Sequence, residues 1–192
     1  MEPHFSVNDK KMFYKYLDNA TGYFEYGSGG STYQASIRKN IKYLYSVESD
    51  KHWHKRVKDN LDTSVSRDTT LIYNEMDTRP KNWGYPGKGA SQKQLKKYSS
   101  RIRKIGLDNQ KKINLLLIDG RFRIACCLKA YDVINDDCKI VFDDFLNRDY
   151  KIVLQYYNII EQTDDNRMVI LQKKKDMDIP KSLILEYEKK PM

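Results

Sequence analysis

Two hydrophobic periods alternate along the chain and predict its architecture. Apolar residues from Met12 to Leu17 recur at helical spacing behind Ser6 and Asp9, which resemble a capping pair, so a helix is predicted over residues 8–19. By contrast, the segments "INLLLIDG" and "CKIVFDD" contain continuous apolar runs, which are typical of strands buried on both faces of a parallel sheet. Amphipathic helices and buried strands therefore follow one another.

The same patterns extend over the whole chain. Strands are predicted at residues 22–26, 42–49, 69–76, 113–120 and 138–144, and helices at residues 8–19, 31–40, 50–61, 121–134 and 147–158. A Pro- and Gly-rich loop, residues 77–91, precedes a basic amphipathic helix whose apolar stripe contains Leu95, Tyr98, Ile102 and Ile105. Residues 158–174 indicate a hairpin that turns at Asp164-Asp165-Asn166.

Alternating strands and helices closed by a hairpin predict an α/β fold. We expect a single domain over residues 1–192, with an N-terminal helix within residues 1–20. Its architecture should be a Rossmann-like three-layer sandwich with a mostly parallel sheet closed by a C-terminal antiparallel hairpin. No apolar run reaches the roughly 18–20 residues of a membrane helix, and the N-terminus lacks the apolar core of a secretion signal. We therefore expect a cytoplasmic protein without a membrane partner, in the host cytoplasm if its source is a virus.

The formal net charge of +9 lies almost entirely in one segment. Residues 88–112 contain nine Lys or Arg and one acid, Asp108, and nine minus one leaves +8. Such an element suits nucleic acid, an anionic ligand or an acidic partner. The three cysteines, Cys126, Cys127 and Cys138, have no CxxC spacing, so we expect buried thiols in a reducing compartment rather than a metal site or a disulfide.

A glycine-rich loop follows the first predicted strand. In "EYGSGGST", Gly27, Gly29 and Gly30 precede a helix start, where bare backbone and free N–H groups favour a carboxylate or a phosphate. Glu48 ends the second strand about 20 positions later, the spacing at which an acid binds ribose hydroxyls. Thr32 replaces the third glycine of a dinucleotide fingerprint, and no GK[ST] follows. S-adenosylmethionine, which carries a ribose and an amino-acid carboxylate, therefore fits better than a cofactor with a pyrophosphate. The alternative is a glycine-rich turn beside a surface acid that binds no cofactor.

Four segments, "FEYGSGGST", "YSVESD", "WGYP" and "LLIDGRFRIACCLKA", resemble class I S-adenosylmethionine-dependent methyltransferases. The likeness covers roughly residues 22–157 and is greatest to small Rossmann-like proteins with EYGSGGST and DGRFR motifs. Some viral glycan and sugar O-methyltransferases look similar in size and motif. The resemblance implies that the glycine loop surrounds the methionine part of the cofactor, Glu48 the ribose and Asp77 the adenine. The implied cofactor-binding residues are Glu25, Gly27, Ser28, Gly29, Ser31, Thr32, Glu48, Ser49, Asp77, Asp119 and Gly120.

Three aspartates end the fourth and fifth predicted strands, Asp119 the fourth and Asp143 with Asp144 the fifth. Neighbouring parallel strands would bring them to one rim, where Asp119 could act as general base and all three could bind Mg²⁺. The pattern is similar to metal-dependent O-methyltransferases, but Arg121 and Arg123 depart from it. A guanidinium there would compete with a cation or bind an anionic group of the substrate. A helix cap at Asp119 and solvated loop residues at Asp143 and Asp144 are the alternatives.

The predicted substrate-binding residues are Trp83, Tyr85, Arg121 and Arg123. The two aromatic rings suit a sugar face, an unpaired base or a lid over the core, and residues 77–112 are expected to cover the acceptor site. The sequence thus predicts an S-adenosylmethionine-dependent O-methyltransferase for a hydroxyl of a sugar or glycan acceptor, with Asp119 as base and Mg²⁺ as an optional partner. An RNA or DNA methyltransferase and a non-catalytic interaction module of the same fold are the alternatives. No pattern in the chain specifies an oligomeric state.

Overall fold

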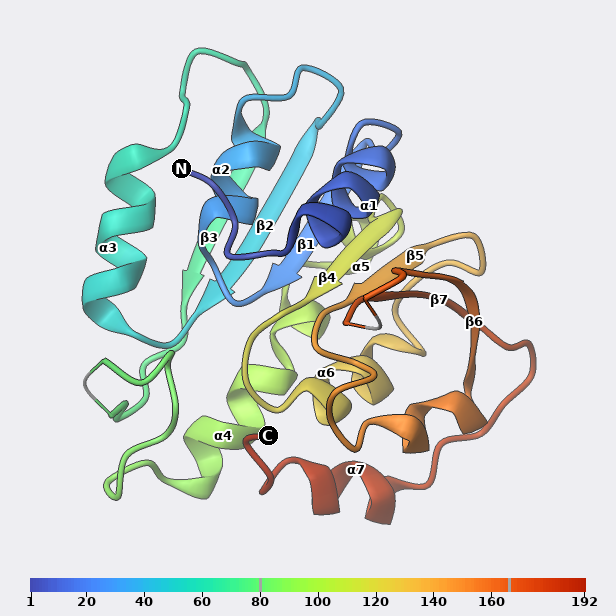
Figure 1. Ribbon diagram of the computed structural model, residues 1–192. Helices are drawn as coiled ribbons and strands as arrows, with labels where there is room; N and C mark the ends of the chain where they lie inside the picture. The colour runs from blue at the N-terminus through green and yellow to red at the C-terminus, as the bar shows by residue number, and fades with distance from the viewer. Residues whose placement is uncertain (80, 166) are drawn as a thin grey trace.

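The computed structural model describes residues 1–79, 81–165 and 167–192. A seven-stranded sheet in the order β3-β2-β1-β4-β5-β7-β6 runs through its centre (Figure 1). The strands are β1 (Gly22–Tyr26), β2 (Tyr43–Glu48), β3 (Asp68–Tyr73), β4 (Leu115–Ile118), β5 (Lys139–Phe142), β6 (Tyr157–Gln162) and β7 (Val169–Lys173). The first five are parallel, whereas β7 pairs antiparallel with both β5 and β6. The predicted parallel sheet with its closing hairpin is therefore confirmed.

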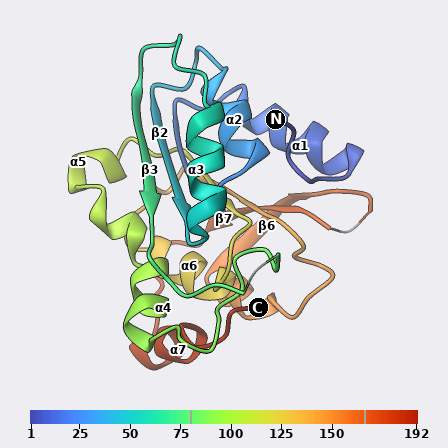
Figure 2. The same cartoon turned by 90° about the vertical axis from the view of Figure 1, so that its left-hand side faces the viewer.

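Helices cover both faces of the sheet and complete three layers. α1 (Val7–Leu17), α2 (Gly30–Ser36) and α3 (Lys51–Asn60) lie on one side, and α4 (Gln92–Ser99) and α5 (Leu107–Gln110) lie on the other (Figure 2). α6 (Arg123–Ala130) packs on the same face as α4, together with the 3₁₀ helices η1 (Arg101–Lys104) and η2 (Lys151–Gln155) and the C-terminal α7 (Lys181–Tyr187). Across the described residues, no helix is long and apolar enough to span a bilayer.

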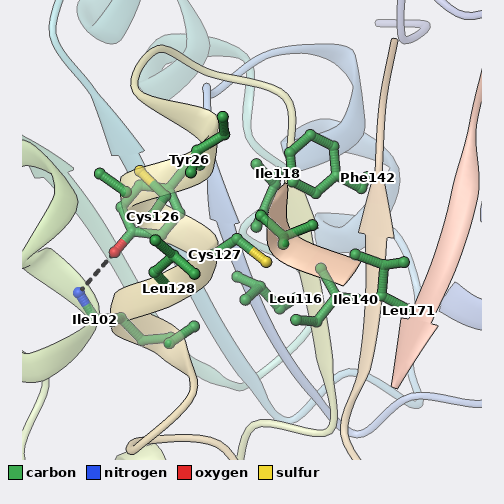
Figure 3. Close-up of a cluster of buried hydrophobic side chains, with 14 of the residues drawn as sticks. Tyr26, Ile102, Leu116, Ile118, Cys126, Cys127, Leu128, Ile140, Phe142 and Leu171 are labelled. Carbon is green, nitrogen blue, oxygen red and sulfur yellow. Dashed lines mark hydrogen bonds between the residues drawn. The ribbon is translucent and has the colours of Figure 1, made fainter. Parts of the chain in front are cut away.

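Side-chain alternation along the strands divides the core between the two faces. In β4, Leu115 and Leu117 belong to the cluster under α1 and α2, whereas Leu116 and Ile118 belong to the cluster under α6. Figure 3 shows the second cluster, in which Cys127 of α6 faces the sheet. All three cysteines are buried, as predicted. The continuous apolar run of β4 thus reflects a strand that is covered on both sides.

The predicted helix over residues 147–158 is wrong. Only the residues of η2 form a helical turn, and β6 already begins at Tyr157. The Tyr157 hydroxyl donates a buried hydrogen bond to the Cys127 carbonyl at 2.9 Å, while β6 pairs with β7. These tertiary contacts outweigh the helical spacing of the apolar residues, because local propensity is weak beside packing. The hairpin is confirmed, and Asn166 of its predicted turn lies outside the described residues.

The predicted basic helix is divided into α4, η1 and α5. α4 ends at Ser99, and the hydroxyls of Ser99 and Ser100 accept hydrogen bonds from the buried Lys129 ammonium at 3.0 and 2.7 Å. Gly106, with a φ of +85°, then interrupts the chain before α5. Lys129 also forms an ion pair with Glu188. This buried pair anchors α7, a helix that the sequence did not predict.

The turns after β1 and β4 meet at the centre of the sheet. Gly27 has a φ of +95°, and a Cβ at this position would lie 2.8 Å from the Gly120 nitrogen. The Gly27 amide donates to the Val47 carbonyl at 2.9 Å, which ties the same turn to β2. Glycine is required here because the backbone conformation and the close approach both exclude a side chain. β1 and β4 are the neighbours at which the strand order changes direction, the place where α/β sheets bind their ligands.

Candidate functional site

The loop after β1 contains three glycines, and folding explains only two of them. Gly27 contacts Gly120, and Gly30 lies against the N-terminal segment, residues 1–5, where a Cβ would lie 2.1 Å from the carbonyl carbon of Glu2. Figure 1 shows this segment passing α2. Gly29 has an extended φ of 177°, and a Cβ there would lie 4.0 Å from the Trp53 ring, an ordinary contact. Neither backbone strain nor packing therefore requires glycine at position 29.

Glu25, predicted to contact the cofactor, is fully buried beneath this loop. Its carboxylate accepts hydrogen bonds from the hydroxyls of Tyr23 and Ser31, each at 2.7 Å, and from that of Thr32. The Thr32 hydroxyl oxygen in turn accepts the Gly29 amide at 2.8 Å. Burial raises the pKa of Glu25, and the hydrogen bonds from the hydroxyls lower it. Glu25 therefore fixes the loop from the inside, because the hydroxyls of Ser31 and Thr32 donate their hydrogen bonds to its carboxylate.

Glu48 lies at the end of β2 beside the same loop and is only 7% exposed. Its Oε1 accepts the backbone N–H groups of Ser49 at 2.6 Å and of Asp50 at 2.7 Å. The structure gives Oε2 no hydrogen bond with any described residue, and no described Lys or Arg forms an ion pair with Glu48. Burial raises the pKa of Glu48 to about 7, although the two N–H groups lower it. A buried carboxyl without a cation and with one unused oxygen is typical of a binding group.

The loop of residues 77–91, of which Pro80 lies outside the described residues, reaches Glu48. A Cβ on Gly84 would lie 3.1 Å from the Ser49 hydroxyl and 3.6 Å from Glu48 Oε1. The neighbouring Trp83 is 74% exposed, and its ring meets the His4 ring edge-on at 5.5 Å. This loop and the N-terminal segment therefore meet beside the glycine loop.

Two predicted site residues hold this loop together. The Asp77 carboxylate accepts the Gly89 amide at 2.8 Å. The Tyr85 ring lies under the Arg79 guanidinium, 4.8 Å from its centroid. Asp77 thus shapes the loop through one carboxylate oxygen, and Ser49 is the predicted cofactor residue that lies next to Glu48.

The three rim aspartates surround the guanidinium of Arg123. Arg123 is 2% exposed, and its nitrogens lie 2.9 Å from Asp119 Oδ1 and 3.5 Å from carboxylate oxygens of both Asp143 and Asp144. The guanidinium therefore lies where a shared Mg²⁺ was predicted. Among the residues that the structure describes, no three His, Cys, Asp or Glu side chains are arranged to hold a metal ion. The predicted magnesium site is not supported, and Arg123, predicted to bind substrate, is used to neutralise its neighbours.

Asp119 differs from its two neighbours in access and charge. Its side chain is 30% exposed, and burial raises its pKa while the Arg123 charge lowers it. Burial and the Asp119 charge raise the pKa of Asp143. Burial also raises the pKa of Asp144, but the charges of three surrounding arginines outweigh burial and bring this pKa below its usual value. Asp119 thus combines access with a raised pKa, which a general base at neutral pH requires.

The segment after Asp119 contains two arginines, Arg121 and Arg123, whose surroundings differ. Gly120 lies under α4, where a Cβ would be 2.1 Å from the Tyr98 hydroxyl. Arg121 follows it, and its Nε is buried without a hydrogen-bond partner among the described residues. Arg123 instead donates to the Gly120 carbonyl at 3.0 Å in addition to its ion pairs. Of the two predicted substrate-binding arginines, only Arg121 keeps donors available.

No family model and no curated protein matches this chain. Among solved structures, a methyltransferase-like protein from Silicibacter pomeroyi is 22% identical, with a TM-score of 0.85 and coverage of 99% of this chain and 98% of that one. A putative caffeoyl-CoA O-methyltransferase from Staphylococcus aureus is 13% identical, with a TM-score of 0.54 over 90% and 85% of the two chains. A ribosomal protein L11 methylase from Lactobacillus delbrueckii subsp. bulgaricus is 10% identical, with a TM-score of 0.56 over 91% and 89%. The chain has the methyltransferase fold.

Sequence reasoning missed two parts of the ligand end of this methyltransferase fold. The Trp53 indole donates to the Ser28 carbonyl at 2.7 Å and lies beside Gly29. The N-terminal segment covers Gly30, and Gln34 fastens it by donating to the Met1 carbonyl at 3.0 Å. The aromatic ring in "DKHWHKR" was a usable signal for the first contact. No local pattern indicates the second, because it joins segments that only the fold brings together.

Replacing Arg123 by Met is expected to destabilise the protein by about 3–5 kcal/mol, because three partly or fully buried carboxylates lose their common counter-charge. Urea unfolding followed by circular dichroism measures the loss. The control is Arg103→Met, which breaks an exposed pair with Asp132 and should cost less than about 1 kcal/mol. Equal, small losses for the two variants would contradict the role assigned to Arg123.

Proposed function

We propose that the protein is an S-adenosylmethionine-dependent O-methyltransferase that transfers a methyl group to a hydroxyl of a sugar or glycan acceptor. The observation that carries the proposal is the unused oxygen of buried Glu48 at the end of β2, together with the bare backbone of the glycine loop that Gly27 ties to Val47 of the same strand. The fold supports it, because these two features lie at the strand ends where α/β sheets bind nucleoside cofactors.

Glu48 suits a ribose better than a cationic group. Its Oε1 is held by two backbone N–H groups, which orients the carboxylate, and Oε2 is left to accept hydroxyl donors. Two vicinal hydroxyls can donate to one carboxylate and repay part of its desolvation. A pyrophosphate would instead bring negative charge next to a buried acid. The site therefore favours a nucleoside whose ribose is joined to an amino acid over one whose ribose is joined to a pyrophosphate.

Asp119 is the residue we assign as general base. A Cβ on Gly27 would lie 2.9 Å from the Asp119 carbonyl carbon, so the backbone of Asp119 lies next to the glycine loop. Bound S-adenosylmethionine supplies a methyl group already activated by the sulfonium. Asp119 would accept the proton of the acceptor hydroxyl as that oxygen takes up the methyl group. Arg123 keeps Asp119 oriented through its 2.9 Å ion pair.

The acceptor is proposed to lie under the loop of residues 77–91, whose Trp83 ring is mostly exposed. A flat ring of this kind suits the apolar face of a sugar. An RNA or DNA acceptor is the second candidate, and the basic segment of residues 88–112 favours it. Two arginines of that segment, however, bind the protein itself: Arg101 donates to Asn74, and Arg103 pairs with Asp132. We therefore place the sugar acceptor first.

Binding of S-adenosylhomocysteine should depend on the ionisation of Glu48. In the ligand-free protein, burial raises the pKa of Glu48 to about 7. Hydrogen bonds donated by ribose hydroxyls favour the ionised carboxylate, so ligand binding should lower this pKa. Affinity should be full above pH 7 and weaken by up to about tenfold per unit below it. Isothermal titration from pH 5.5 to 8 measures this trend. Glu48→Gln should bind weakly with a flat profile, whereas Glu186→Gln on exposed α7 should match the wild type; an unchanged Glu48→Gln profile would refute the ribose assignment.

Gly29→Ala should separate binding from folding. Because φ is extended and the nearest atoms to a Cβ are 4.0 Å away, the variant should unfold within a degree or two of the wild type. The added methyl group would occupy space that the cofactor needs, so affinity for S-adenosylhomocysteine should fall at least about tenfold. Thermal unfolding and titration measure the two effects. Gly106→Ala is the opposite control: its φ of +85° strains an alanine, so this variant should melt below the wild type yet bind S-adenosylhomocysteine normally. Unimpaired binding by Gly29→Ala would count against the loop as the cofactor site.

Asp119→Asn should slow methyl transfer by about 10²–10⁴-fold while leaving affinity for S-adenosylhomocysteine within about threefold. The assay is transfer of a labelled methyl group from S-adenosylmethionine to a panel of sugars and oligonucleotides. Because Arg123 lies among the rim carboxylates, turnover should persist after chelation. Asp132→Asn is the control at an exposed site. Unaltered turnover by Asp119→Asn would exclude it as the base, and turnover on oligonucleotides alone would favour the second candidate.

A further inference from the structure

Three buried polar atoms without partners lie just beyond β4 and β5. Among the described residues, Arg121 Nε, Asp143 Oδ1 and the Tyr150 hydroxyl are buried and make no hydrogen bond. Tyr150 packs on Phe142 at the end of β5, with ring centroids 5.1 Å apart. Buried polar groups are nearly always paired in folded proteins. Asp143 Oδ1 is an acceptor and offers nothing to an anion, whereas Arg121 Nε and the Tyr150 hydroxyl are two unused donors that influence one another electrostatically. These two donors indicate a place for ligand atoms that accept hydrogen bonds.

One guanidinium at this rim has no carboxylate partner among the described residues. Asp119, Asp143 and Asp144 pair with three arginines: Arg123, Arg148 and Arg167. No described carboxylate forms an ion pair with Arg121. Burial lowers the pKa of Arg121 first, and the charges of Arg123 and Arg148 lower it further. A guanidinium without a carboxylate partner and with a buried, unpaired Nε carries a desolvation cost, and a bound anion offsets that cost.

We propose that Arg121 is the receptor for an oxyanion on the acceptor, so that the enzyme methylates a hydroxyl of an acidic substrate, one carrying a carboxylate, phosphate or sulfate group. A guanidinium binds such groups through paired N–H donors, and the Tyr150 hydroxyl can donate to the same anion. Arg121 follows Asp119 by two residues, which span at most about 7 Å. An anion held by Arg121 would thus fix the distance between the acceptor and the base. The acceptor role rests on the proposed function, but anion binding by Arg121 does not.

The test uses sodium sulfate, inorganic phosphate and sodium acetate as probes on the full chain, each compared with sodium chloride at equal ionic strength. Thermal unfolding is followed with and without S-adenosylhomocysteine. At least one oxyanion should raise the melting temperature of the wild type with saturation, beyond the unsaturable effect of excluded salts. A stronger response to sulfate and phosphate indicates a tetrahedral dianion, and a stronger response to acetate indicates a carboxylate. No saturable response to any probe, in either state, overturns the proposal.

Variants separate this site from general basic charge. Arg121→Gln should weaken the saturable response at least tenfold, Tyr150→Phe should weaken it several-fold, and Arg103→Gln, which removes the same charge from η1, should leave it unchanged. Equal losses in Arg103→Gln and Arg121→Gln overturn the proposal. So does an Arg121→Met variant that melts well below the wild type without anion, because an unpaired cation should not be needed for folding.

Cofactor binding distinguishes the two proposals. Arg121→Gln should bind S-adenosylhomocysteine within about threefold of the wild type. A loss of cofactor affinity as large as the loss of sulfate response would make Arg121 a ligand of the cofactor carboxylate and overturn the acceptor assignment. A wild type that binds sulfate through Arg121 but binds no S-adenosylhomocysteine would refute the proposed function and leave the anion site standing.

Discussion

The contact between the turns after β1 and β4 is the constraint on which the candidate site depends. Gly27 lies against Gly120 and is also tied to β2 through the Val47 carbonyl. Three strands are thereby held in one register at their carboxyl ends. As a result, Glu48 at the end of β2 and Asp119 after β4 belong to strand ends that are both joined to the same loop. The loop cannot move independently, because buried Glu25 binds it from below.

The two acids beside this loop have different surroundings and are therefore suited to different tasks. Glu48 has backbone N–H partners and no cation among the described residues, so neutral hydroxyl donors can complete its hydrogen bonds. Asp119 shares Arg123 with two other carboxylates and remains partly open to solvent. Environment, rather than residue type, thus separates the carboxylate that we propose as the ribose ligand from the one that we propose as the proton acceptor. The same comparison separates Arg123, which is paired on all sides, from Arg121, which is not.

The features that depend on short segments could be predicted from the sequence. The positions of the strands along the chain follow from apolar runs such as that of β4, and the glycine loop and Glu48 were picked out by their spacing. The role of Arg123 could not be predicted, because its partners end two different strands and only the sheet brings them together. The magnesium prediction is unsupported for this reason: the aspartates were recognised, but not the Arg123 guanidinium between them.

Other errors had the same origin. Tyr157 reads as part of a helix until its hydroxyl is seen to reach α6. The N-terminal segment contains no motif, yet it explains why Gly30 must be glycine. Local patterns therefore identified residues whose side chains can bind ligands or transfer protons. Tertiary contacts, by contrast, decide which of these residues are used to hold the fold together. Gly29 stands out only when Gly27 and Gly30, the loop glycines that folding requires, have been set aside.

The most direct test of the central claim is a crystal structure of the protein with S-adenosylhomocysteine. The account predicts density with the ribose hydroxyls on Glu48 Oε2 and the amino-acid end passing Gly29, while Oε1 keeps its two backbone donors. A ribose bound by another side chain, or a protein whose crystals stay free of the ligand at saturating concentration, would contradict it.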